Sequence, residues 1–117
     1  MGRLTTHVLD TAHGRPAEGV VMALYRLEAG GARRKLGDFV TNADGRCDRP
    51  LLEGAAFGIG SYELTFAAGD YFARLGVTLP DPRFVDVISI HFGVAEDQHY
   101  HVPLLVSPFA YSTYRGS

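Results

Sequence analysis

Glycine and proline interrupt the apolar stretches of this chain at short intervals, and this punctuation limits the secondary structure that it can form. The 117 residues include 14 Gly and 6 Pro. The runs between these residues suit short strands better than long helices. Residues 61–68 (SYELTFAA) alternate between polar and apolar side chains, which is the period of a half-buried strand. The pattern therefore predicts a mainly β chain.

The apolar runs predict seven strands, at residues 4–10, 19–28, 35–42, 61–68, 84–94, 99–106 and 109–115. Both alternating faces are apolar in residues 19–28, so we expect this strand to be buried on both sides near its start. In the strand at residues 84–94, Phe84 is expected to share a face with Ile88 and Ile90.

One short helix is expected at residues 70–75, where Gly76 provides the C-terminal stop. Seven or eight short strands with one helix are typical of a β-sandwich built from two sheets. We therefore expect an all-β fold with one short helix, in a single domain over residues 1–117.

Charge and hydropathy exclude several classes of partner. The formal net charge of -2 at pH 7 argues against binding to nucleic acid or to an anionic membrane. No stretch approaches the roughly 18 apolar residues that would cross a bilayer, and the first ten residues do not have the composition of a signal peptide. With Cys47 as the single cysteine, no intramolecular disulfide can form, and we expect a cytoplasmic protein.

Three of the five histidines stand where they could carry chemistry. His99 and His101 share one face of a predicted strand, and His7 lies on an early strand with Thr5. Two imidazoles on adjoining strands could serve as general base and general acid near neutral pH. The His-Tyr-His run could instead be half of a zinc site, but no third ligand stands at a suitable spacing, so no metal is expected.

Other reactive side chains have simpler interpretations. His13 falls in a turn and is expected to be solvated, and His91 is expected to be a core or interface residue. Cys47 is expected to be a small packed residue rather than a nucleophile. Ser107 and Ser112 lack the Gly-x-Ser-x-Gly surroundings of a nucleophile elbow.

Arg46 follows a strong turn signal at Asp44-Gly45, and we expect it to open a strand. A strand-borne guanidinium would be a rigid mount for a planar anion. From spacing alone, a surface arginine remains the simpler interpretation.

Three segments together resemble the transthyretin-like family. Residues 4–12 (LTTHVLDTA), with Gly14 and Pro16-Ala17, resemble its opening motif, and residues 41–46 (TNADGR) resemble its T-x-x-D-G-R segment. Residues 99–108 (HYHVPLLVSP) and 111–117 (YSTYRGS) are similar to its terminal signature. The closing Tyr-Arg-Gly-Ser separates the enzyme branch of the family from the hormone-carrier branch, which lacks it.

The resemblance implies a prealbumin-like sandwich of two four-stranded sheets, assembled as a homotetramer with active sites between dimers. The implied reaction is the hydrolytic ring opening of 5-hydroxyisourate to 2-oxo-4-hydroxy-4-carboxy-5-ureidoimidazoline in urate degradation, with no metal or organic cofactor.

The resemblance also implies a set of site residues. His7, Arg46 and His101 match positions of the enzyme branch. We expect catalytic roles for His7, His101, Arg46 and Ser117, substrate binding by His7, Arg46 and Tyr114, and possible roles for His99 and Arg115. Which histidine is the base and which the acid is left open.

Two other functions compete with hydrolysis. A transthyretin-type carrier would bind small aromatic ligands in the same channel without catalysis, but it would have no use for a His/Arg/His set. A structural sandwich domain of a surface protein is the third possibility, and the lack of a signal-peptide pattern weighs against it.

Overall fold

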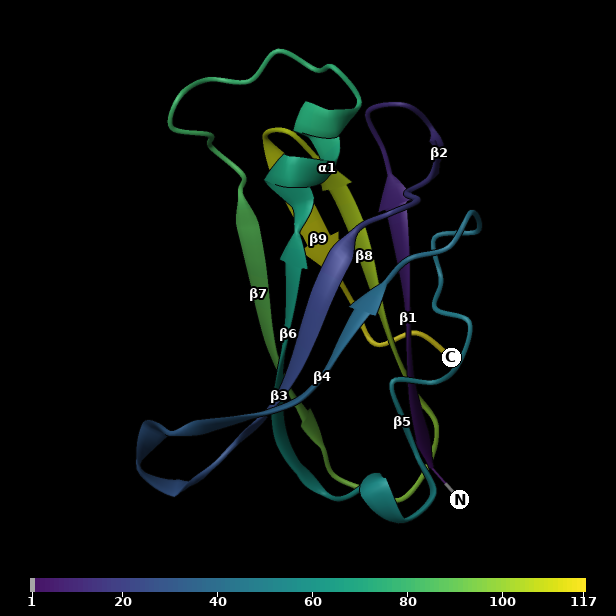
Figure 1. The fold of residues 1–117 in the computed structure, drawn as a ribbon. Coiled ribbons are helices and arrows are strands. Elements are labelled where there is room, and N and C mark those ends of the chain that lie inside the picture. The colour runs from purple at the N-terminus through teal and green to yellow at the C-terminus, as the bar shows by residue number, and fades with distance from the viewer. Residues whose placement is uncertain (1) are drawn as a thin grey trace.

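The computed structural model describes residues 2–117 and consists of two β-sheets packed face to face, with one helix at one end (Figure 1). One sheet has five strands in the order β2-β1-β8-β9, with β5 also paired to β1, and the other has four in the order β4-β3-β6-β7. The elements are β1 (Arg3–Asp10), β2 (Arg15–Pro16), β3 (Val21–Leu27), η1 (Ala29–Gly31), β4 (Arg33–Val40), β5 (Leu52–Glu53), η2 (Gly54–Ala56), β6 (Gly60–Ala67), α1 (Ala68–Arg74), β7 (Val87–Val94), β8 (Tyr100–Ser107) and β9 (Ala110–Thr113).

The two-sheet sandwich and the short helix confirm the expected fold class, with one difference in strand number. The resemblance implied two four-stranded sheets, whereas the sheet containing β1 has a fifth strand because β5 pairs with the start of β1. The helix begins two residues earlier than expected, and Gly76 follows its end with a φ of 84°, a conformation that favours glycine. Within residues 2–117, no helix is long and apolar enough to cross a membrane.

The core lies between the two sheets and follows from the alternation of each strand. In β1, Leu4 and Val8 point inward and are fully buried, while the odd-numbered residues face outward. In β6, the alternation predicted for residues 61–68 is confirmed, because Tyr62, Leu64 and Phe66 are all buried. The outward face of β1 is therefore left free for other uses.

Two strand predictions are wrong. The strand at residues 19–28 is buried on one side only. Val21 faces outward and is 54% exposed, whereas Met22 faces the core and is buried. Phe84 does not share a strand face with Ile88, because β7 begins at Val87 and Phe84 is 75% exposed. The backbone carbonyl of Asp86 accepts a hydrogen bond from Gly69 in the helix instead of joining the sheet.

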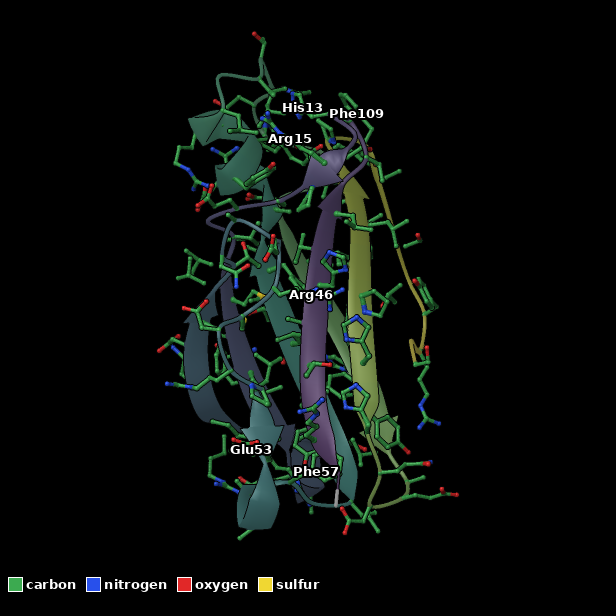
Figure 2. All side chains as sticks on the ribbon, turned by 90° about the vertical axis from the view of Figure 1, so that its right-hand side faces the viewer. His13, Arg15, Arg46, Glu53, Phe57 and Phe109 are labelled. Carbon is green, nitrogen blue, oxygen red and sulfur yellow. The ribbon has the colours of Figure 1, made fainter. Side chains whose placement is uncertain are left out.

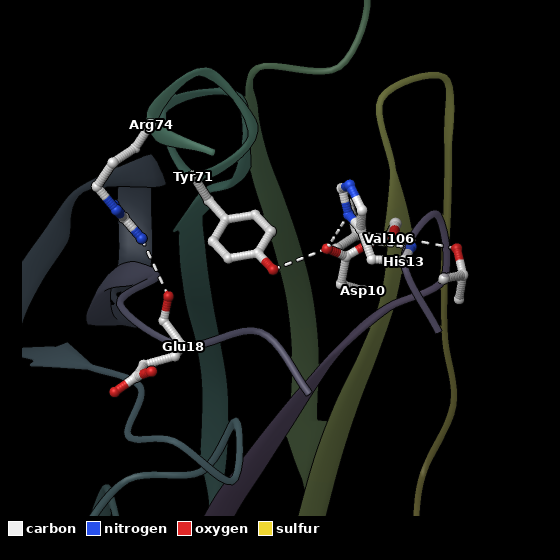
Figure 3. A network of polar contacts seen from close by, with 7 residues as sticks. Asp10, His13, Glu18, Tyr71, Arg74 and Val106 are labelled. Atoms are coloured by element: carbon white, nitrogen blue, oxygen red, sulfur yellow. Dashed lines mark hydrogen bonds and ion pairs between the residues drawn. The ribbon is translucent and has the colours of Figure 1, made fainter. Parts of the chain in front are cut away.

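A buried carboxylate fastens the helix to the end of β1 (Figure 3). Asp10 is 1% exposed and accepts hydrogen bonds from the Tyr71 hydroxyl at 2.7 Å and from His13 Nδ1 at 2.6 Å. His13 lies in a turn and is exposed, as the sequence predicts, and its ring also hydrogen-bonds to Asp10. On the other side of the helix, Arg74 donates to the carbonyl of Glu18 (Figure 3).

The hydrogen bond between Tyr71 and Asp10 influences the protonation of both side chains. Burial acts to raise the pKa of Asp10, but the hydrogen bonds from Tyr71 and His13 outweigh it and hold the pKa below its ordinary value. Burial, followed by the hydrogen bond to Asp10 and its charge, raises the pKa of Tyr71 to about 12. The tyrosine therefore stays protonated and donates to a carboxylate.

We expect Tyr71→Phe to lower the free energy of unfolding by about 1.5–3 kcal/mol at pH 7, because it removes a hydrogen bond to a buried charge. Since the folded-state pKa of Asp10 is depressed, this contribution is present above the unfolded-state pKa of 3.8 and is lost as the pH falls through the folded value. Urea unfolding at several pH values measures both effects. Tyr25→Phe is the control, because within residues 2–117 the Tyr25 hydroxyl makes no hydrogen bond; an equal loss there would contradict the assignment.

Candidate active site

The parallel pairing of β1 with β8 brings together histidines from opposite ends of the chain. In this register Thr5 lies opposite His101, and His7 lies opposite Pro103. The rings of His7 and His101 are 6.4 Å apart between centroids, and the ring of His99 is 6.4 Å from that of His101. The histidines expected on adjoining strands therefore share the outer face of the five-stranded sheet.

Arg46 reaches this face from the loop that joins β4 to β5. β2 and β5 pair with the two ends of β1, and between them the Gly45 carbonyl accepts a hydrogen bond from the Val8 N–H at 2.8 Å. A Cβ at Gly45 would lie 2.4 Å from the Val8 oxygen, so only glycine fits there. Figure 2 shows Arg46 midway along β1, far from Phe57 and Phe109 at the two ends of the sheet.

The prediction that Arg46 opens a strand is wrong. The side-chain oxygen of Asn42 accepts hydrogen bonds from the backbone N–H groups of Asp44 and Arg46, at 2.9 and 3.1 Å. This curls the loop and leaves Arg46 exposed, outside any regular element.

The C-terminal tail borders the site on the β8 side. β9 ends at Thr113, earlier than predicted, and Gly116 then forms an antiparallel bridge with His101 in the same register. The ladder is interrupted at Tyr114 because its partner position is Pro103, which has no N–H to donate. The Gly116 N–H donates to the His101 carbonyl at 2.8 Å.

The same glycine packs against the imidazole of His101. A Cβ at Gly116 would lie 2.6 Å from Cδ2 of that ring, so a larger residue would displace the ring or the tail. The absence of a side chain at Gly116 therefore lets the tail backbone lie close to His101.

These segments enclose an open cavity of about 500 Å³. Six of the seven predicted site residues line it: His7, Arg46, His99, His101, Tyr114 and Ser117. The exception is Arg115, whose guanidinium stacks 3.9 Å from the centre of the Tyr100 ring. Its Nη2 is 3.4 Å from the His99 carbonyl, so Arg115 contacts the edge of the site rather than the cavity.

The cavity also contains residues that the sequence did not single out as functional. Thr5 Oγ1 lies 2.7 Å from His101 Nδ1 and 3.3 Å from His99 Nε2. Arg3 lines the cavity as well, and its spacing of two and four residues from Thr5 and His7 could have indicated this. Arg49 enters from the irregular loop, where no periodicity could have found it.

Burial and Arg46 control the charge of the site. Burial first, and then the positive charge of Arg46, lower the pKa of His7 and of His101 below the ordinary value of 6.5. Both rings are therefore neutral at neutral pH. Burial also raises the pKa of the Cys47 thiol, which makes it a poor nucleophile.

His91 does not lie in the core: it is exposed on the outer face of the four-stranded sheet, with Nε2 3.5 Å from a Glu63 carboxylate oxygen. Across residues 2–117, no group of three His, Cys, Asp or Glu side chains is placed to hold a metal ion.

Residues 4–116 match the HIUase/Transthyretin family. The chain belongs to this family. It is 64% identical over 116 residues to the 5-hydroxyisourate hydrolase of Mesorhizobium japonicum, across 99% of this chain and 93% of that protein.

Two solved structures extend the comparison within the HIUase/Transthyretin fold. An (S)-allantoin synthase superposes with a TM-score of 0.94 at 50% identity, over 99% of this chain but only 44% of that longer protein. Sea bream transthyretin in complex with thyroxine superposes with a TM-score of 0.87 at 28% identity, over 97% of this chain and 94% of that one.

We expect Arg46→Gln to raise the pKa of both His7 and His101 towards 6.5, because the positive charge of Arg46 disfavours a second positive charge nearby. Since burial is the larger cause, both values should stay below 6.5. Titration of the imidazole signals by NMR measures the shifts. Arg83→Gln is the control, because Arg83 pairs with Asp70 and Asp86 away from the cavity; unchanged values in Arg46→Gln would remove Arg46 as a cause.

Proposed function

We propose that this chain is a 5-hydroxyisourate hydrolase, with residues 1–117 acting as one hydrolase domain. It would open the six-membered ring of 5-hydroxyisourate with water to give 2-oxo-4-hydroxy-4-carboxy-5-ureidoimidazoline in urate degradation, a branch of purine metabolism. The observation that carries the proposal is the meeting of His7, Arg46 and His101 in one cavity. The high identity to a relative named for this activity supports it.

The cavity suits the chemistry of such a substrate, which is small, planar and rich in carbonyl groups. The guanidinium of Arg46 can bind a carbonyl oxygen and offset the charge that develops there. A neutral imidazole can take a proton from water as the water oxygen attacks the carbonyl carbon. The ring C–N bond then breaks and the released nitrogen receives a proton. The proposed step uses only side chains of the protein and needs no cofactor.

The tail completes the proposed site. Tyr114 and Ser117 are exposed at its edge, where their hydroxyl groups can contact the substrate or a catalytic water.

The proposal includes assembly as a cytoplasmic homotetramer with sites at the interface between dimers. Arg46, Tyr114 and Ser117 are exposed in the single chain although they line the cavity. A second dimer over this face would exclude water and strengthen the electrostatic interactions inside. Full activity of a monomer, measured by sedimentation and assay at the same dilution, would contradict this arrangement.

The competing function is a carrier of small aromatic ligands, which sea bream transthyretin represents among the structural neighbours. The two functions separate in one assay, in which the protein is mixed with freshly made 5-hydroxyisourate and the ultraviolet absorbance is followed. A hydrolase shortens the decay relative to the spontaneous reaction, whereas a carrier leaves the decay unchanged.

In the same assay, we expect His7→Ala and His101→Ala each to lower kcat by roughly 10²–10⁴-fold, the usual contribution of a positioned acid or base. His91→Ala is the control, because His91 lies exposed on the other sheet. Normal turnover in His101→Ala together with lost turnover in His99→Ala would show that the wrong member of this pair was chosen.

Removal of residues 114–117 should abolish ring opening and leave the fold and assembly intact. These residues follow β9 and are exposed or half-buried, so their loss leaves the core unchanged. Circular dichroism, sedimentation and turnover of the truncated chain test this. Retained turnover would exclude the tail from the site, and loss of the folded assembly would give the tail a structural role.

A further inference from the structure

The hydroxyl of Thr5 lies between two imidazoles of the cavity, 2.7 Å from His101 Nδ1 and 3.3 Å from His99 Nε2. Among residues 2–117, His99 Nδ1 is buried without a hydrogen-bond partner. His101 Nε2 makes no hydrogen bond to the described part of the chain and is not buried, so it is the nitrogen left to face a substrate.

These contacts indicate where the hydrogens lie, because a threonine hydroxyl has one hydrogen to donate. If Thr5 donated to His99 Nε2, a neutral His99 would carry its hydrogen on Nδ1, where the buried N–H has no acceptor. If Thr5 donates to His101 Nδ1, His99 donates through Nε2 and leaves only an acceptor unpaired. Buried donors without a partner are the rarer case.

The two distances agree with the second arrangement. A separation of 2.7 Å between Thr5 Oγ1 and His101 Nδ1 suits a hydroxyl donor. The 3.3 Å between Thr5 Oγ1 and His99 Nε2 is longer than the common N–H···O distance and suits the weaker of the two bonds.

We propose that Thr5 is a positioning residue that holds His101 with its hydrogen on Nε2, so that His101 donates a hydrogen bond to the substrate and His7 is the base. This inference rests on the hydrolase function proposed above. Nε2–H would bind the carbonyl oxygen on which charge develops. His7 takes a proton from water as the oxygen–carbon bond forms, and passes it to the nitrogen released when the C–N bond breaks.

The surroundings of the two rings support this division. Burial and then Arg46 lower the pKa of His7, but a backbone hydrogen bond at Asp44 and the charge of Asp44 act in the opposite direction and favour a protonated ring. For His101, burial, Arg46 and the neighbouring histidines all lower the pKa. A base must accept a proton during the reaction, whereas a neutral ring can serve as a hydrogen-bond donor throughout.

The position of the hydrogen can be measured without substrate. In the full-length protein labelled with ¹⁵N-histidine, NMR distinguishes a ring nitrogen that carries hydrogen from one that does not, and the signals missing from His101→Gln identify His101. We expect a protonated Nε2 and a bare Nδ1 in His101. A hydrogen on Nδ1 would overturn the proposal.

Variants of Thr5 test the consequence for turnover. Thr5→Val removes the hydroxyl but keeps the β-branched shape, and it should lower kcat by about 10–100-fold with little change in KM, a part of what a positioned group contributes. Thr5→Ser keeps a hydroxyl and should retain most of the wild-type kcat. Thr65→Val is the matched control, because Thr65 lies in the other sheet and its hydroxyl donates a long hydrogen bond of 3.4 Å to the Ala23 carbonyl.

A normal kcat in Thr5→Val would overturn the proposal, and so would a loss confined to KM, which would make Thr5 a substrate-binding group. The test is separable from that of the hydrolase function. Wild-type protein that fails to open the ring would refute the function, while the NMR result would still decide the arrangement of Thr5 and His101. Active protein with the His101 hydrogen on Nδ1 would refute only the inference.

Discussion

The parallel pairing of β1 with β8 is the constraint on which the rest of the structure depends. It joins residues 96 positions apart in the chain, such as Thr6 and Val102. Because side chains alternate along a strand, one register sends Leu4 and Val8 into the core and His7 towards solvent. A shift of one residue would reverse both faces at once, so the packing of the core also fixes the positions of the imidazoles.

Two irregular segments, the loop around Gly45 and the C-terminal tail, complete the cavity. Each lies where the outer edge of β1 or of β8 has no regular strand paired to it. Along β1, the short strands β2 and β5 leave a gap that the loop around Gly45 fills. Along β8, Pro103 interrupts the ladder with β9, and Gly116 then closes over His101. Glycine and proline therefore limit the strands and also admit the segments that carry Arg46 and Ser117.

Much of this architecture is predictable from the sequence, because the alternation of side chains between the two faces of a strand is a local property. This alternation predicts β6 closely and places His99 and His101 on one face. The prediction fails where long-range contacts decide. The Asp86 carbonyl accepts a hydrogen bond from Gly69 in the helix, and β7 therefore begins at Val87 and does not include Phe84.

Long-range contacts also limit what the sequence predicts about the site. The motifs of the chain point to His7, Arg46 and His101, but they do not show that Arg46 lies in a loop or that Arg115 stacks on Tyr100. The sequence does not identify Thr5 as a functional residue, because its position between two imidazoles arises only from the pairing of distant strands.

The two faces of β1 also separate the demands that selection places on this strand. Inward residues such as Leu4 and Val8 determine stability, while Thr5 and His7 face the cavity. Adjacent positions are therefore under different selective constraints. A change of core volume need not alter the cavity side chains as long as the backbone stays in place. An engineer can repack the inward positions for thermal stability, and vary the outward ones for substrate choice, within a single strand of eight residues.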